Sequence, residues 1–183
     1  MFKTRRVRRQ FLSLFGGLFT LPLLWDSLSS FAFGKPRDLR ASGNTACLRL
    51  ALELSNLPVA TKSYNLHLRN ASLTLRDVKL IASAMCKGED ISGPSLLSLS
   101  MSHNFNITDI GVQALVSVLP DTITDIGFVG CGLSDKAGLA LLRWARISEN
   151  LQLICIEENN FSQALKNEFN SLSKKKLPLS VVI

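Results

Sequence analysis

Apolar and polar residues alternate over a short stretch of the chain and then change to a helical spacing. Residues 97–101 alternate between apolar and serine side chains, as in a strand with one buried face. From Thr108 to Pro120 the apolar residues recur three and four positions apart, as in an amphipathic helix. The sequence therefore predicts a short strand and a helix that are joined by residues 102–107.

The strand pattern recurs along the chain. Each copy reads apolar-x-x-apolar-x-apolar-x-x, followed by a small or amide side chain. That last residue is Ala71, Asn104, Cys131 or Asn159, so successive copies are 33, 27 and 28 residues apart. The first copy is the least regular, because Ser63 occupies its first apolar position. We expect four short strands whose alternate residues point toward a common core.

Each strand pattern is followed by a signal for the start of a helix. Thr74 and Asp77 have the spacing of a capping box. The later copies are followed by Thr108, Ser134 and Ser162, hydroxyl residues of the kind that favour helix starts. Apolar residues at helical spacing come next in every copy. The sequence therefore predicts strands and helices that alternate, which defines an α/β protein.

These copies resemble the leucine-rich repeat family, whose repeats carry the pattern LxxLxLxx(N/C)xL. The period of 27–28 residues resembles the ribonuclease-inhibitor-like subclass, and the resemblance covers residues 63–173 in about four repeats. It implies a short solenoid with parallel strands on the concave face and helices on the convex face. It also implies that the asparagine amides bond the backbone of neighbouring turns as a ladder.

Two positions depart from that ladder pattern. Cys131 can form only a weak hydrogen bond and Ala71 can form none, so the first repeat is expected to be the looser end. The loop after Asn104 has one extra residue, Asn106, and we expect a small bulge there.

The two ends of the body are less regular than its middle. Residues 33–62 are interpreted as a linker and an N-terminal cap, in which residues 45–60 form either an alternating strand or an apolar helix. Solenoids need such caps, because a terminal repeat would otherwise expose its apolar side. Residues 174–183 are interpreted as a C-terminal cap or tail that adds a final short strand.

Residues 1–32 have the layout of an export signal. A basic stretch is followed by an apolar run at residues 11–25 and by a small-residue site that ends at Ala32. Arg8 and Arg9, followed by Gln-Phe-Leu, resemble a twin-arginine signal, although Val7 stands where Ser or Thr is usual. That resemblance implies a cleaved signal and a periplasmic or secreted protein. A general secretory signal, an uncleaved membrane anchor and a mitochondrial transit peptide remain open.

The positive charge of the chain is concentrated in this segment. The formal net charge is +7, and residues 1–32 hold five of the 21 basic and one of the 14 acidic residues. The rest of the chain therefore has a net charge of only +3. No pattern of aromatic and basic residues accompanies it, so we do not expect nucleic-acid binding. Membrane contact is expected only through the N-terminal segment.

We find no constellation of residues that predicts catalysis. The sequence has no nucleophile elbow, phosphate-binding loop or zinc-protease motif. His67 and His103 lie in neighbouring repeats and could approach one another, but they lack further ligands for a metal. Cys131 is expected to point inward and Cys155 outward, which favours free thiols. We therefore expect no enzyme activity, no cofactor and no metal.

What remains is the outward side of the predicted strands, which forms the concave face of the solenoid. Solenoids commonly bind proteins on this face. The candidate binding residues are His67, Arg69, Ser98, Ser100, Ser102, Asp125, Leu153 and Glu157. The expected function is that of a non-enzymatic protein-binding module with an unidentified protein partner. The alternatives are a structural or envelope-associated repeat protein without a discrete ligand and an organellar assembly factor behind a transit peptide.

Overall fold

A computed structural model describes residues 40, 42–56, 58, 60–85 and 94–183, so the predicted export signal and Cys86 lie outside the described residues. The described part is an α/β structure with a five-stranded parallel sheet in the order β1-β2-β3-β4-β5. The strands are β1 (Ser63–His67), β2 (Ser95–Ser100), β3 (Asp125–Gly127), β4 (Leu153–Cys155) and β5 (Ser180–Val182). The helices are α3 (Thr45–Ser55), α4 (Leu75–Met85), α5 (Thr108–Val116), α6 (Asp135–Ile147) and α7 (Gln163–Lys175).

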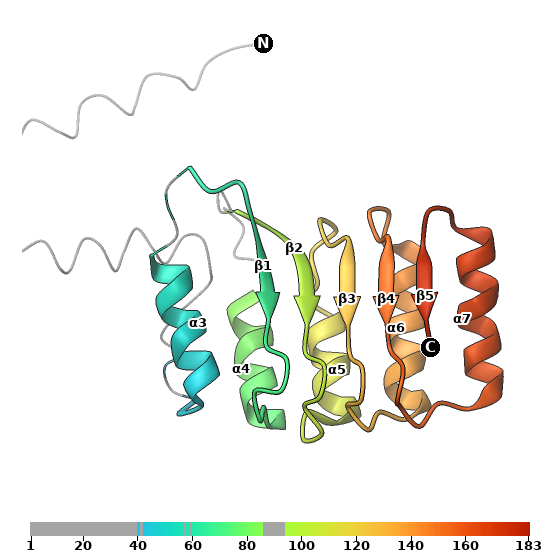
Figure 1. Cartoon of the computed structure of the whole chain (residues 1–183), viewed down its shortest axis with the longest axis horizontal. Coiled ribbons are helices and arrows are strands. Elements are labelled where there is room, and N and C mark those ends of the chain that lie inside the picture. Colours follow the sequence, from blue (N-terminus) through green and yellow to red (C-terminus); the bar gives the residue numbers. More distant parts are fainter. Residues whose placement is uncertain (1–39, 41, 57, 59, 86–93) are drawn as a thin grey trace, which may run out of the picture.

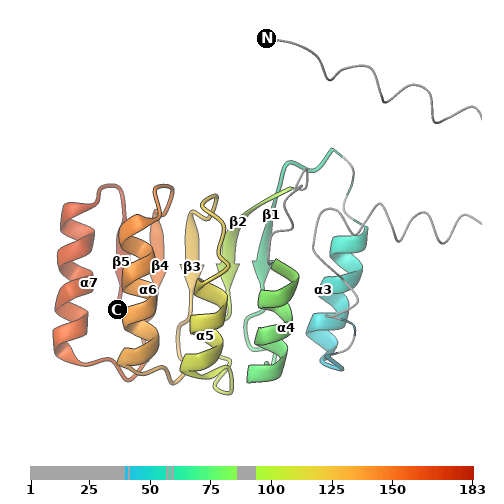
Figure 2. The same cartoon turned by 180° about the vertical axis from the view of Figure 1, so that it is seen from behind.

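The sheet and the helices form two layers. Figure 1 shows the strands side by side in chain order, and Figure 2 shows α4, α5 and α6 on the other side of the sheet. Helix α3 lies beside the first strand, and α7 lies at the opposite end. Among the described residues, no helix covers the face of the sheet that points away from α4, α5 and α6, and we call this the open face.

The inner face of the sheet is built by the apolar positions that the strand pattern predicted. The parallel register places Leu66, Leu99, Ile126 and Ile154 in one row across four strands. All four side chains are at most 2% exposed. A row of this kind buries one face of each strand against the helices, so the predicted direction of these side chains is confirmed.

Helix α3 resolves the ambiguous segment before the first strand. Asn44 caps the helix, because its Oδ1 accepts hydrogen bonds from the backbone N–H groups of Ala46 and Cys47. The helix buries Leu50 and Leu54 but leaves Leu52 56% exposed. A strand would have placed these three leucines on the same side, whereas a helix separates them.

The predicted helix starts are confirmed with one difference. Thr74 and Asp77 form the capping box, and the side chains of Ser134 and Ser162 accept backbone N–H groups of α6 and α7. Thr108 begins α5 but no side chain caps that helix. Helix α5 also ends at Val116, earlier than the proline-based prediction.

Acidic residues at the helix starts connect neighbouring units. The carboxylate of Asp109 accepts hydrogen bonds from the backbone N–H and the hydroxyl of Ser134, at 2.9 and 2.6 Å. Asp135 accepts the backbone N–H of Ser162 at 2.7 Å. The hydrogen bonds from Ser162 hold the pKa of the Asp135 carboxyl below its usual value. An aspartate–serine contact therefore joins the start of α5 to the start of α6, and a second one joins the start of α6 to the start of α7.

The loop with the extra residue leaves an aromatic side chain in solvent. Asn106 pairs with Thr74 as an isolated parallel bridge, and Phe105 beside it is 70% exposed. The bulge expected at Asn106 stays a prediction. A register shift lies between β1 and β2 instead, where Leu96 and Ser98 pair with consecutive residues of β1. The sequence pattern did not indicate this shift, because Leu97 continues the alternation of β2.

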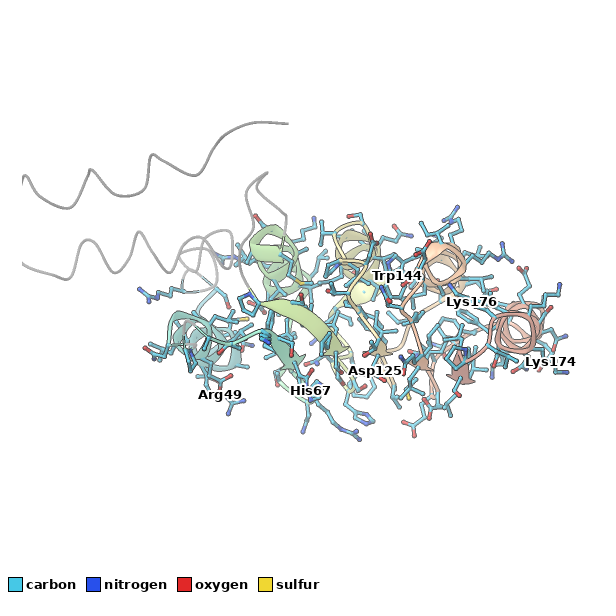
Figure 3. The ribbon with its side chains drawn as sticks, turned by 90° about the horizontal axis from the view of Figure 1, so that it is seen from above. Arg49, His67, Asp125, Trp144, Lys174 and Lys176 are labelled. Atoms are coloured by element: carbon cyan, nitrogen blue, oxygen red, sulfur yellow. The ribbon has the colours of Figure 1, made fainter. Side chains whose placement is uncertain are left out.

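The C-terminal residues close the far end of the sheet. Strand β5 pairs with β4 in parallel, which confirms the predicted final strand. After α7, the amino group of Lys176 donates hydrogen bonds to the carbonyl oxygens of Ala145 and Ser148 at the end of α6. A cation is favourable there, because the carbonyl groups of the last helical turn lack partners within the helix. Figure 3 shows Lys176 beside α6, whereas Lys174 lies at the outer end.

Candidate functional site

The turns that leave the sheet are held by asparagine side chains. Asn104 is 1% exposed, and its Oδ1 accepts the backbone N–H groups of Ala71 and Leu73, each at 3.0 Å. Its Nδ2 donates to the carbonyl oxygens of Leu68 and Met101, at 2.8 and 2.7 Å. One side chain therefore satisfies four backbone groups from two neighbouring turns.

Asn159 repeats this arrangement two units further along. Its Oδ1 accepts the N–H groups of Cys131 and Leu133, and its Nδ2 donates to the carbonyl oxygens of Phe128 and Ile156. The four distances lie between 2.8 and 3.1 Å. The hydrogen bonds from side-chain amides that the resemblance implied are therefore present at both asparagines.

Cys131 occupies the ladder position between the two asparagines. Its thiol donates a hydrogen bond to the carbonyl oxygen of Met101 at 3.3 Å. Burial raises the pKa of the Cys131 thiol, so that the group remains a protonated donor. A thiol has a single, weak S–H donor, whereas an asparagine side chain has two N–H donors and a carbonyl oxygen. Cys131 therefore joins fewer backbone groups than Asn104 or Asn159 does.

The first rung has a partner that the sequence did not predict. Ala71 has no polar side chain, but the Nδ2 group of Asn44 donates to its carbonyl oxygen at 3.0 Å. Asn44 also caps α3, so one side chain joins the N-terminal helix to the first turn. The side chain of Ala71 itself makes no such bond, and the looser first repeat stays a prediction. The only available signal was an asparagine directly before a possible helix.

The residue before each ladder position has left-handed backbone geometry. Asn70, His103, Gly130 and Glu158 have φ angles of 50°, 58°, 59° and 58°. Gly130 also leaves room for its neighbours, because an added Cβ would lie 2.8 Å from His103 Nδ1 and 3.1 Å from Glu158 Oε2. The side chains of His103 and Glu158 therefore both occupy space beside Gly130 that a larger residue would need.

The basic end of the open face lies at β1 and β2. The guanidinium of Arg69 donates to Nε2 of His103 at 2.8 Å, because arginine has donors only and the histidine nitrogen must accept. His67 is exposed and pairs instead with the hydroxyl of Ser98 at 2.9 Å. Each histidine therefore has a hydrogen-bond partner in a neighbouring unit, and that partner is not the other histidine.

The middle of the open face carries short side chains. Ser98 and Ser100 are partly exposed, and Gly127 in the next strand has no side chain. Ser102 is only 3% exposed. Its hydroxyl accepts hydrogen bonds from the backbone N–H of Val129 at 3.1 Å and from Ser100 at 3.3 Å. The prediction that Ser102 is displayed for binding is therefore wrong, because the neighbouring turn covers it.

The acidic end of the open face lies at β3 and β4. Asp125 and Leu153 are adjacent in the register, and both are partly exposed (Figure 3 shows Asp125 on the side away from α4, α5 and α6). Burial raises the pKa of the Cys155 thiol, and the charges of Glu157 and Asp125 raise it further. Two carboxylates therefore act on the same thiol.

Glu157 contains an unusual oxygen atom. Its Oε2 is shielded from solvent and forms no hydrogen bond in the described structure. A buried carboxylate oxygen without a donor is unfavourable, since it has lost water and gained no partner. This feature could not be read from the sequence, where adjacent glutamates at a strand exit indicate a solvated pair.

The described residues contain no group of three or more His, Cys, Asp or Glu side chains that could hold a metal ion. Cys47, Cys131 and Cys155 have free thiols. No family model matches the chain, and no curated protein matches it. The fold and the candidate site together define an α/β protein with one parallel sheet, helices on one face and a charged, open second face.

Proposed function

We propose that this chain is a non-enzymatic protein-binding module of the leucine-rich repeat type, and that its partner binds on the open face. The observation that carries the proposal is the charge arrangement of that face. Arg69 is exposed at β1, and Asp125 and Glu157 lie at β3 and β4. Interfaces with charges of both signs fix the orientation of a partner.

The ladder supports the assignment to a repeat architecture. Asn104 and Asn159 make the same four kinds of backbone contact in two different units. Identical contacts at equivalent positions are what stacked repeats require, since each unit rests only on its neighbours. A sheet held in this way presents its open face as a rigid surface, which lowers the entropic cost of binding.

The proposal includes export through the N-terminal segment. Its support is the sequence of residues 1–32, above all the pair Arg8 and Arg9. None of the helices formed by the described residues has both the length and the apolar character needed to cross a bilayer. From the sequence of residues 1–32, we propose that the open face works in the periplasm or outside the cell.

Exchange of two charges on the open face is expected to weaken capture of the partner. The variant Arg69→Glu with Glu157→Arg keeps the net charge but inverts both ends of the face. Reversed charges would face like charges on the partner, so we expect the affinity to fall by about tenfold or more. The measurement is capture from a native extract by the full-length chain, followed by titration of the captured protein.

The matched control is Arg143→Glu with Glu149→Arg, two exposed residues on or just after α6. This variant is expected to capture the partner as the wild type does. Equal capture by the open-face variant would reject this face as the binding surface. If even the wild type captures nothing, the chain is better described as a structural repeat protein without a discrete ligand.

A further inference from the structure

The open face separates its charges over a defined distance. Arg69 is the second residue after β1, and Glu157 is the second residue after β4. The parallel register places these residues three strand steps apart. Neighbouring strands are about 4.8 Å apart, so the two charged positions are separated by about 14 Å. Continued by two residues, the same register places Ser102, which is buried, and Val129, which is partly exposed, in the row between them.

The acidic end of the open face is formed by Glu157, which is partly exposed. One of its carboxylate oxygens, Oε2, is shielded from solvent and has no donor in the described structure. The carboxylate has therefore lost part of its hydration when the chain folds. A cation of the partner would meet the exposed part of this side chain, and less of the desolvation cost that weakens ion pairs would remain.

The basic end offers donors to an anion. The guanidinium of Arg69 has five N–H groups, and the contact with His103 uses one nitrogen atom. The side chain is exposed, so the remaining donors are accessible. A planar guanidinium binds a carboxylate through two parallel hydrogen bonds. The contact with His103 holds the guanidinium in place and reduces the entropy that such a pair would lose.

We infer that the partner inserts an extended segment that crosses the strands, with a carboxylate on Arg69 and an arginine on Glu157. This inference rests on the proposed function and specifies what the face recognises. An extended chain advances about 3.4 Å per residue, so a span of about 14 Å corresponds to about four residues. Arginine suits the acidic end, because its planar and weakly hydrated guanidinium matches the geometry of a carboxylate.

Synthetic peptides of defined charge spacing test this inference. The probe is a fluorescent peptide of Ser, Thr and Gly that carries one Glu and one Arg about four positions apart, and the matched peptide has the same composition with adjacent charges. Fluorescence polarisation with the full-length chain is expected to show about tenfold tighter binding of the spaced peptide. The variants Arg69→Gln and Glu157→Gln should each remove this preference, whereas Glu149→Gln should keep it.

Several results would overturn the inference. They are equal affinity for the two peptides, no detectable binding of either, and a preference that survives both Arg69→Gln and Glu157→Gln. The proposed function fails separately, because it depends on capture of a whole protein by the open face. A partner that is lost from the charge-exchange variant while the peptides are not distinguished would indicate a folded surface instead of an extended segment.

Discussion

Replacement of Asn104 by alanine is expected to lower the free energy of unfolding by about 3–4 kcal/mol. The side chain is buried and satisfies four backbone groups, which belong to Leu68, Ala71, Leu73 and Met101. Alanine fills part of the space but leaves these groups without partners. An unpaired buried polar group costs about 1–3 kcal/mol, and relaxation of the two turns should recover part of the sum. Urea unfolding of the full-length chain measures the effect.

The matched variant is Cys131→Ala at the next ladder position. The thiol makes a long hydrogen bond to Met101 and a longer one to Val129, so its loss should cost only about 1 kcal/mol. The order of the two effects is the informative result. If Asn104→Ala and Cys131→Ala destabilise the chain equally, the hydrogen bonds of the Asn104 side chain do not contribute the stability that we assign to them.

Replacement of Gly138 by alanine is expected to destabilise the chain by about 1–3 kcal/mol. An added Cβ would lie 2.3 Å from Leu165 Cδ2 and 3.0 Å from a ring atom of Phe161. Alanine alone would favour a helix by about 1 kcal/mol, but the contact must push α7 or the aromatic ring away. The steric term should win, because the displaced groups are themselves buried, with Leu165 at 3% and Phe161 at 8% exposure.

Gly111→Ala on α5 provides the comparison at a looser contact. Its added Cβ would lie 3.2 Å from Val78 Cγ1, where a shift of a few tenths of an ångström suffices. Helix propensity and crowding should then nearly cancel, and the change in thermal unfolding midpoint should be small. A stabilising effect at Gly138, or an equal loss at Gly111, would contradict the close packing of α6 on α7.

The sequence was sufficient to predict the side chains that build the core. Leu99 and Ile126 point inward because the period of a strand is two, and the helix starts at Ser134 and Ser162 follow from local capping chemistry. These features depend on neighbours within a few positions. The sequence did not decide whether the segment of α3 is a strand or a helix. Its leucines stand at every second position, as in a strand, but some of them also fall on one side of a helix.

The details of the candidate site depend on contacts between distant residues. Ser102 is buried because the backbone of Val129 in the next unit reaches its hydroxyl. Glu157 Oε2 is shielded from water by the fold around it, and Asn44 bonds to Ala71, which lies 27 positions further along the chain. A linear pattern indicates which face a residue occupies, but it does not indicate which hydroxyl or carboxylate is covered there.

Contact between the open face and a partner can be measured directly with a photo-crosslinking side chain. A benzophenone residue in place of His67, which is exposed on the open face, should form a covalent product with a discrete protein on irradiation in a native extract (Figure 3). The same residue in place of Arg143, which is exposed on α6, should not form that product. A product from position 143 alone, equal products from both positions, or no product from either would contradict the account.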